Sequence, residues 1–237
     1  MNANKLRLLP LLALLLAIGA VSCESLGLKA AQYHPAVEPS AFSTVVNNPY
    51  CPHVPGTTLR YTEKDKGEIS ENVITVTRDT KLVMGVKCVV VHDVVMKNGR
   101  VAEDTYDWVA QHKDGTVWYF GEDTKEISPG GLIRTLGSWE AGINGAQPGI
   151  LMPGQSSPGA PYRQEYGLGV AEDMGQIVDV GVSASVPAGT FSDCVKTKEW
   201  SLLESGHENK WYARGVGFIK ETGSDGATAV LTSITRE

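Results

Sequence analysis

The sequence predicts a mainly β protein: one domain built from a curved antiparallel sheet, half-barrel or sandwich-like, with a long Gly/Pro-rich insertion. Runs rich in Val, Thr, Tyr, Trp and Ile alternate with Gly, Asn and Asp turns, which is typical of strands joined by tight turns. Apolar residues nowhere repeat convincingly with helical spacing. Ala171–Val178 is the best candidate for a short helix, although Gly175 interrupts it.

The β-rich runs define the expected strands and their connections. Asn98-Gly99 and Asp114-Gly115 each lie between two such runs and are typical of two-residue hairpin turns. They predict a three-stranded meander from Val86 to Glu122. The complete set of expected strands is Thr58–Glu63, Asn72–Arg78, Val86–Lys97, Arg100–His112, Thr116–Glu122, Tyr162–Gly167, Thr190–Leu203, Lys210–Glu221 and Thr228–Thr235.

Both faces of this meander are predicted to be largely apolar, since successive side chains of a strand point to opposite sides. Val89 and Val91 lie on one side, and Val90 and Val94 on the other. Such a sheet must be covered on both sides or must hold an apolar ligand on its concave face. The Gly/Pro-rich insertion, Ser128–Pro161, is expected to be either a lid or plug over the sheet or a long edge crossover.

The two turns also set a register that brings acidic residues together. Asp93 is expected opposite Asp104, and Asp107 opposite Glu122, with His92 diagonal to Asp107. Like charges in opposed positions destabilise a sheet, so a partner is expected there. His92, Asp107 and Glu122 are candidate acid–base residues, and Asp93, Asp104, Asp107 and Glu122 are candidate ligands of a divalent cation. The alternative is a wet end of the sheet where water and lysines screen the charges. No other cofactor is expected.

The N-terminus has the organisation of a secretory signal. Lys5 and Arg7 precede an apolar run, Leu8–Val21, which is shorter than the roughly 20 residues of a spanning helix. Ala20–Cys23 resembles the lipobox of bacterial lipoproteins, so residues 1–22 are expected to be removed and Cys23 to carry the lipid. Ordinary cleavage nearby is the alternative. Acyl chains contribute about 0.8 kcal/mol per buried methylene, which makes such anchoring stable.

The rest of the chain divides into a tether and a domain. Residues 23–54 are rich in Pro, Ala, Ser and Asn and are expected to form the tether, and residues 55–237 the β domain. Cys88 and Cys194 lie in strand-like segments of an exported chain, so a disulfide between them is expected, with Cys51 left over. The alternative is that all three thiols are free.

Charge and motifs exclude several classes of protein. The net charge is −6, and removing the basic leader makes it more negative, so nucleic acid and anionic lipid headgroups should be repelled. The sequence holds none of the serine-hydrolase, zinc-protease or phosphate-loop motifs.

Five segments between Asn48 and Glu221 carry a family resemblance: Asn48–Thr57, Glu103–Trp108, Lys113–Asp123, Gly189–Glu199 and Trp211–Phe218. Together they resemble an uncharacterised family of secreted bacterial β-rich domains. That family is in turn distantly similar to the half-barrel fold of lipoprotein-localisation factors. The resemblance implies a fold and an envelope location but no activity.

Three functions follow as hypotheses. The first is a lipid-anchored envelope protein, facing the periplasm or the exterior, that binds an apolar ligand or a partner protein. The second is a hydrolase or metal-dependent enzyme that uses His92, Asp107 and Glu122. The third is a structural envelope lipoprotein.

Overall fold

The structure is a computed structural model that describes residues 33–237. The predicted signal peptide, residues 1–22, and the predicted lipidation site, Cys23, lie outside the described residues. Between residues 33 and 237 there is no helix of the length and apolarity that crossing a membrane requires.

The described chain forms one antiparallel sheet of fifteen strands. The main path runs β10-β11-β12-β13-β14-β15-β2-β3-β4-β5-β6-β7, while β1 pairs with β5, and β8 and β9 pair with β6. The strands are β1 Phe42–Ser43, β2 Thr57–Asp65, β3 Glu68–Val83, β4 Val86–Lys97, β5 Arg100–His112, β6 Val117–Ile127, β7 Ile133–Arg134, β8 Trp139–Glu140, β9 Gly149–Met152, β10 Tyr162–Arg163, β11 Asp173–Val186, β12 Gly189–Ser201, β13 Glu208–Ala213, β14 Gly217–Gly223 and β15 Thr228–Arg236.

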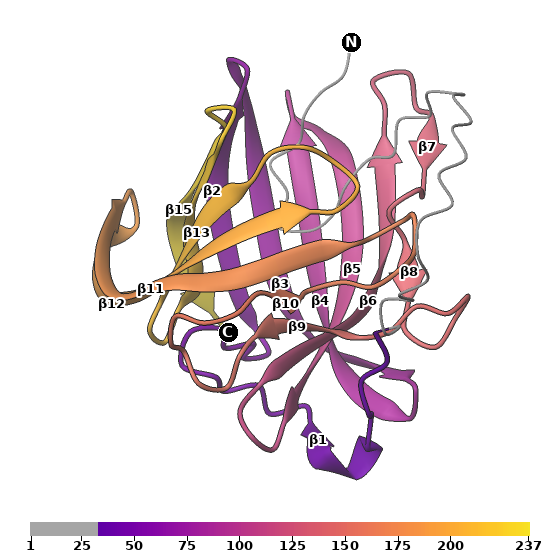
Figure 1. Cartoon of the computed structure of the whole chain (residues 1–237). Helices are drawn as coiled ribbons and strands as arrows, with labels where there is room; N and C mark the ends of the chain where they lie inside the picture. Colours follow the sequence, from indigo (N-terminus) through magenta and orange to yellow (C-terminus); the bar gives the residue numbers. More distant parts are fainter. Residues whose placement is uncertain (1–32) are drawn as a thin grey trace, which may run out of the picture.

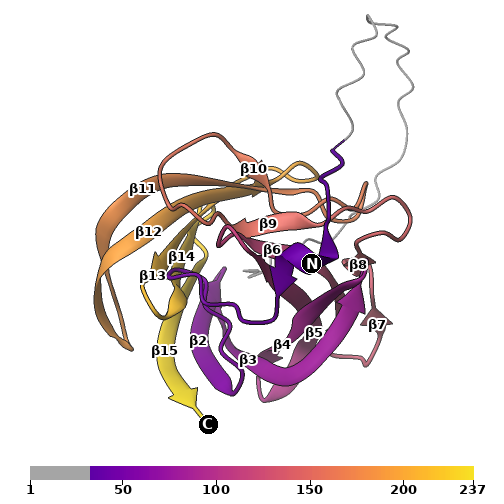
Figure 2. The ribbon, with the colours of Figure 1, turned by 90° about the horizontal axis from the view of Figure 1, so that it is seen from below.

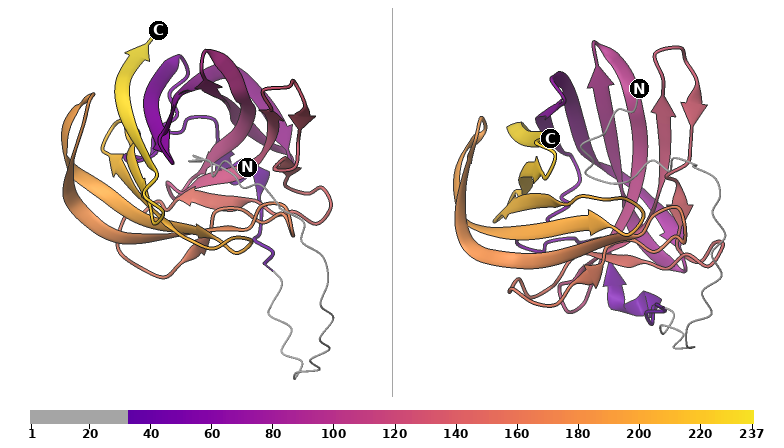
Figure 3. Two further views of the ribbon diagram at one scale, coloured as in Figure 1. Left: turned by 90° about the horizontal axis from the view of Figure 1, so that it is seen from above. Right: turned by 45° about the horizontal axis from the view of Figure 1, so that its top comes forward.

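The sheet curls strongly but does not close, which confirms the predicted fold class. Figure 1 shows the long strands β2 to β6 standing side by side, with β11 and β12 crossing in front of them. From below, the strands follow an arc, and β9 lies between β10 and β6 (Figure 2). The view from above shows the same open ring (Figure 3). We call the concave side of this arc the inner face and the convex side the outer face.

The first predicted hairpin turn is confirmed. Asn98 and Gly99 have φ of 52° and 73°, and Lys97 pairs with Arg100, as a type I′ turn requires. The second turn has three residues instead of two, because the amide of His112 donates to the carbonyl of Thr116 at 2.9 Å.

β-Bulges then change the register of the meander. One bulge lies on β5, where Ala102 is the extra residue between the pairs Val95–Glu103 and Met96–Val101. His92 therefore pairs with Tyr106, and Val91 with Asp107. Between β5 and β6 a second bulge offsets the extra residue of the turn, so Asp107 still pairs with Glu122, as predicted. A bulge adds one residue to one strand, and each one therefore displaces every later pair.

The predicted helix over Ala171–Val178 is wrong, because most of this segment belongs to strand β11. Its partner β12 determines the conformation: Gly175 pairs with Glu199, and Ile177 with Thr197. A Cβ at Gly175 would lie 2.7 Å from the ring of Tyr162, so this glycine allows close packing within a strand.

The predicted tether is also too long, since its last part is folded. Phe42 pairs with His112 in the β1–β5 ladder and packs edge-on against Trp118 and Phe120. Val46, Asn48, Tyr50 and Cys51 are buried. The tether prediction failed because this segment packs through single residues without a regular period.

The insertion lengthens the edge of the sheet, as the crossover alternative expects. Its short strands β8 and β9 pair with β6, and Trp139 and Met152 are buried. Gly149 is needed in β9 because a Cβ there would lie 2.0 Å from the carbonyl oxygen of Gln164.

Candidate functional site

The inner face carries a row of polar side chains that crosses six adjacent strands. Directly opposed residues in antiparallel strands point to the same side of a sheet, and the ladders from β12 to β3 place these residues in one line. The row consists of Thr197, Lys210, Glu221, Ala229, Glu63 and Ser70. Side chains alternate between the two faces along each strand, so these charged groups lie on the same face as the buried apolar residues.

Lys210 is the centre of the first part of this row. Its Nζ lies 2.8 Å from Oε2 of Glu199, 3.5 Å from Oε2 of Glu208 and 3.6 Å from Oε2 of Glu221. Oε1 of Glu199 also accepts hydrogen bonds from the hydroxyls of Thr197 at 2.6 Å and Tyr212 at 2.9 Å. One ammonium group is therefore shared by three carboxyl groups.

These carboxyl groups differ in protonation. Burial would raise the pKa of Glu199, but Lys210 and the hydroxyl donors outweigh burial and hold this pKa below its usual value. Burial and the neighbouring Glu208 raise the pKa of Glu221 well above its usual value, although Lys210 opposes this. Glu199 is thus the ionised partner of Lys210, and Glu221 holds a proton into a higher pH range.

Glu63 and Asp93 form the second part of the inner face. The hydroxyl of Ser70 donates to Oε2 of Glu63 at 2.9 Å, and Nδ2 of Asn72 donates to Oδ1 of Asp93 at 2.9 Å. Burial, assisted by the charge of Glu103, raises the pKa of Glu63 to about 7. Burial and the charges of nearby carboxyl groups raise the pKa of Asp93 well above its usual value.

Asp107 and Glu122 form the third part. The hydroxyl oxygen of Tyr119 lies 2.7 Å from Oδ1 of Asp107 and 3.1 Å from Oε2 of Glu122. A hydroxyl has one proton to donate, so a protonated carboxyl group is needed for both contacts to be hydrogen bonds. Burial raises the pKa of Asp107 to about 7, which supplies that proton at neutral pH and below.

His92 lies on the outer face, so the predicted acid–base cluster is wrong. Its ring stacks on Tyr106 at 4.3 Å between centroids, and Nε2 lies 2.7 Å from Oδ1 of Asp104. Asp107 and Glu122 point to the other side of the sheet, as their ladders with Val91 and Trp139 show. The extra residue Ala102 in β5 shifts the partner of His92 by one residue, from Thr105 to Tyr106.

The predicted cation ligands are separated in the same way. Asp104 pairs with Val94 on the outer face, whereas Asp93 pairs with Thr105 on the inner face. In residues 33–237, no three His, Cys, Asp or Glu side chains are grouped closely enough to hold a metal ion.

Two acceptors on the inner face lack a donor. In the described part of the chain no group donates to Oδ1 of Asn72 or to Oε1 of Glu221, and both atoms are buried. A buried acceptor without a partner costs about 1–3 kcal/mol. Asn72 points toward the site, since its amide nitrogen bonds to Asp93.

The inner face is strongly acidic overall. The described residues include seven buried carboxyl groups, Glu63, Glu103, Asp107, Glu122, Glu165, Glu199 and Glu221, and one buried lysine or arginine, Lys210. Asp93 is partly exposed, and the Glu208 side chain is 31% exposed, so the acidic surface reaches solvent. Its chemistry favours cations and hydrogen-bond donors.

The sequence patterns did not predict the roles of Lys210, Glu63, Glu199 and Glu221. A signal was present: Leu59 and Tyr61 alternate with polar residues, and continuing that alternation places Glu63 on the buried side. The hairpin turns of the meander gave no information about these strands.

The predicted disulfide between Cys88 and Cys194 is absent from the structure. Cys51, Cys88 and Cys194 are all free and buried. Cys88 lies on β4 and Cys194 on β12, with five strands between them in the sheet, so strand pairing does not bring the two thiols together.

No protein-family model and no curated protein matches the chain. Two solved structures are similar to it, each with 15% sequence identity. One is a candidate exported protein with a YmcC-like fold from Bacteroides fragilis, with a TM-score of 0.47, covering 79% of this chain and 99% of that one. The other is a candidate lipoprotein from Parabacteroides distasonis, with a TM-score of 0.43, covering 78% of this chain and 98% of that one. Similarity this low supports no further conclusion.

Proposed function

We propose that the chain is a lipid-anchored protein of the bacterial envelope that binds a ligand and performs no chemistry. The apolar run Leu8–Val21 and the lipobox-like Ala20–Cys23 support export and anchoring. Mass spectrometry of the N-terminal peptide from the producing cell tests the anchor. A diacylglyceryl group on Cys23 supports it, and an unmodified N-terminus elsewhere refutes it.

The ligand that fits the inner face carries protonated amino groups. The raised pKa values of Glu63, Asp93 and Glu221 carry this proposal, because an ammonium group beside these carboxyl groups would favour their ionised forms and pair with them. An ammonium group also supplies donors for the acceptors on Asn72 and Glu221 that have none. A purely apolar ligand, as the sequence suggested, would leave these groups without partners.

The spacing of the carboxyl groups favours an extended oligoamine over a metal ion. Glu221 lies on β14 and Glu63 on β2, with β15 between them. Adjacent strands are about 4.8 Å apart, so the backbones of these two residues are about 10 Å apart across the sheet. The described residues hold no group of three metal-ligating side chains, whereas amino groups spaced along a flexible chain can reach carboxyl groups on separate strands.

Isothermal titration of the purified protein with spermidine tests this function. We expect saturable binding that weakens several-fold when Asp93→Asn removes one carboxylate. Glu71→Gln is the matched control, because Glu71 is exposed and pairs with Arg60 on the outer face. Magnesium chloride at equal ionic strength should not compete.

Three outcomes contradict the proposal. Saturable binding of magnesium in place of spermidine would identify a metal site. An equal loss in both variants would show that the spermidine contacts lie elsewhere. Failure of spermidine to bind would favour a purely structural lipoprotein.

A further inference from the structure

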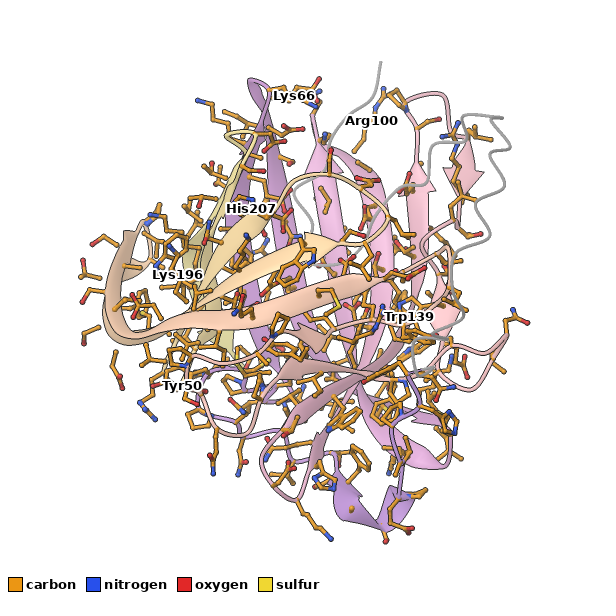
Figure 4. The ribbon with its side chains drawn as sticks, in the orientation of Figure 1. Tyr50, Lys66, Arg100, Trp139, Lys196 and His207 are labelled. Carbon is orange, nitrogen blue, oxygen red and sulfur yellow. The ribbon has the colours of Figure 1, made fainter. Side chains whose placement is uncertain are left out.

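A basic and aromatic surface lies on the outer face, directly behind the Lys210 cluster. It is formed by Lys196, Lys198 and Trp200 of β12, Trp211 of β13 and Lys220 of β14, and we call it the Lys–Trp face. Lys196 pairs with Trp211, and Trp211 with Lys220, so these side chains share one side of the sheet. Figure 4 labels Lys196 near one side of the molecule.

The lysines of this face rest on the tryptophans. Nζ of Lys196 lies 4.8 Å from the centre of the Trp211 ring, and Nζ of Lys220 lies 5.1 Å from it. Nζ of Lys198 lies 5.9 Å from the centre of the Trp200 ring. Each ammonium group is therefore held at the surface of an aromatic ring.

These three lysines also lack counter-ions. Two other lysines of the sheet are paired: Lys97 with Glu68, and Lys125 with Asp123. Within residues 33–237 no carboxylate forms an ion pair with Lys196, Lys198 or Lys220. Asp179 of β11 lies opposite Lys196 in the β11–β12 ladder, so the positive charge of the three lysines is only partly offset. In a chain of net charge −6, this local excess of positive charge is complementary to an external anion.

Two exposed apolar residues follow directly after the end of β12. Leu202 is 50% exposed and Leu203 is 38% exposed. Lysines, tryptophans and leucines together are the composition of surfaces that lie on a bilayer, where lysines meet anionic headgroups and the other side chains enter the interface.

We propose that the Lys–Trp face docks onto an anionic phospholipid bilayer. The net negative charge of the chain does not prevent this, because exposed charges farther apart than a Debye length of about 8–10 Å are screened from one another. Docking would orient the sheet at the membrane and is independent of the ligand on the inner face.

Lysine labelling of the full-length protein in vesicles tests the docking. One preparation has phosphatidylcholine vesicles, and the other contains phosphatidylglycerol as well. We expect an amine-reactive reagent to label Lys196, Lys198 and Lys220 several-fold more slowly with phosphatidylglycerol, and added salt to remove the difference. The exposed Lys87 and Lys113 are internal controls and should be labelled at the same rate in both.

A variant separates docking from general protection. Lys198→Glu combined with Lys220→Glu should abolish the slower labelling of Lys196 while leaving the melting temperature unchanged. Equal rates in the two vesicles, or an equal slowing at Lys87 and Lys113, would overturn the proposal. Protection by soluble dextran sulfate without protection by the vesicles would do so too, since the partner would then be a polyanionic polymer.

Discussion

Replacing Glu63 by Gln should stabilise the protein at neutral and alkaline pH. Glu63 is 4% exposed, and burial followed by the charge of Glu103 raises its pKa from 4.5 to about 7. The folded state therefore keeps the Glu63 proton at pH values where the unfolded state has lost it. Stability is unaffected below about pH 4.5 and falls as the pH rises to about 7. Each pKa unit corresponds to 1.36 kcal/mol, so the loss is about 3 kcal/mol.

The glutamine side chain in the Glu63→Gln variant would keep the shape and the acceptor for Ser70 but could not ionise. We expect the variant and the wild type to be equally stable near pH 4.5, and the variant to be more stable by about 3 kcal/mol near pH 8. Urea denaturation monitored by tryptophan fluorescence measures both. Glu71→Gln is the control. Glu71 follows Ser70, the ladder partner of Glu63, but it is exposed and forms an ion pair with Arg60. This variant should change the unfolding free energy by less than about 1 kcal/mol at either pH.

The result that would refute this reasoning is a Glu63→Gln variant with the same pH dependence as the wild type. Other charged groups face Glu63: Glu103 and Glu221 disfavour its ionisation, and Lys97 favours it. If Lys97 compensated the buried charge fully, the pH dependence would be absent from both proteins.

Three further changes test the rest of the inner face and the cysteines. Lys210→Met removes the cation shared by Glu199, Glu208 and Glu221, so it should destabilise the protein by about 3–5 kcal/mol near pH 7 in urea denaturation, and by less in acid. Tyr119→Phe removes the hydroxyl that lies between the carboxyl groups of Asp107 and Glu122. It should lower the unfolding free energy by about 1–3 kcal/mol in the same assay. A reducing agent should leave the melting temperature unchanged, because Cys88 and Cys194 are free; a decrease on reduction would show that they are bonded.

Local signals predicted the middle of the sheet well. The structure has β4 as Val86–Lys97 and β5 as Arg100–His112, the same limits that the sequence predicts, because Asn98-Gly99 determines both strand ends. The predicted strand Lys210–Glu221 is instead two strands, β13 and β14, joined by a turn. Gly215 and Gly217 marked that break, with φ of 73° and 97°.

The candidate site was harder to predict because it depends on register and on distant pairing. The single extra residue of the bulge in β5, Ala102, leaves no mark in the sequence, yet it determines on which face of the sheet a given pair lies. Lys210 and Glu63 belong to the same row of the inner face only because β15 pairs with β2. These two strands come from opposite ends of the domain sequence. No pattern within either strand specifies that pairing.

The same carboxyl groups link the stability of the fold to the proposed binding. A carboxyl group that destabilises the folded state when ionised gains most when a ligand brings a positive charge beside it, because the ligand stabilises only the folded form. Glu63→Gln should therefore raise stability and weaken spermidine binding together. If the variant becomes more stable but binds spermidine as the wild type does, Glu63 is a buried group of the core, and the binding surface must lie nearer the partly exposed Asp93 and Glu208.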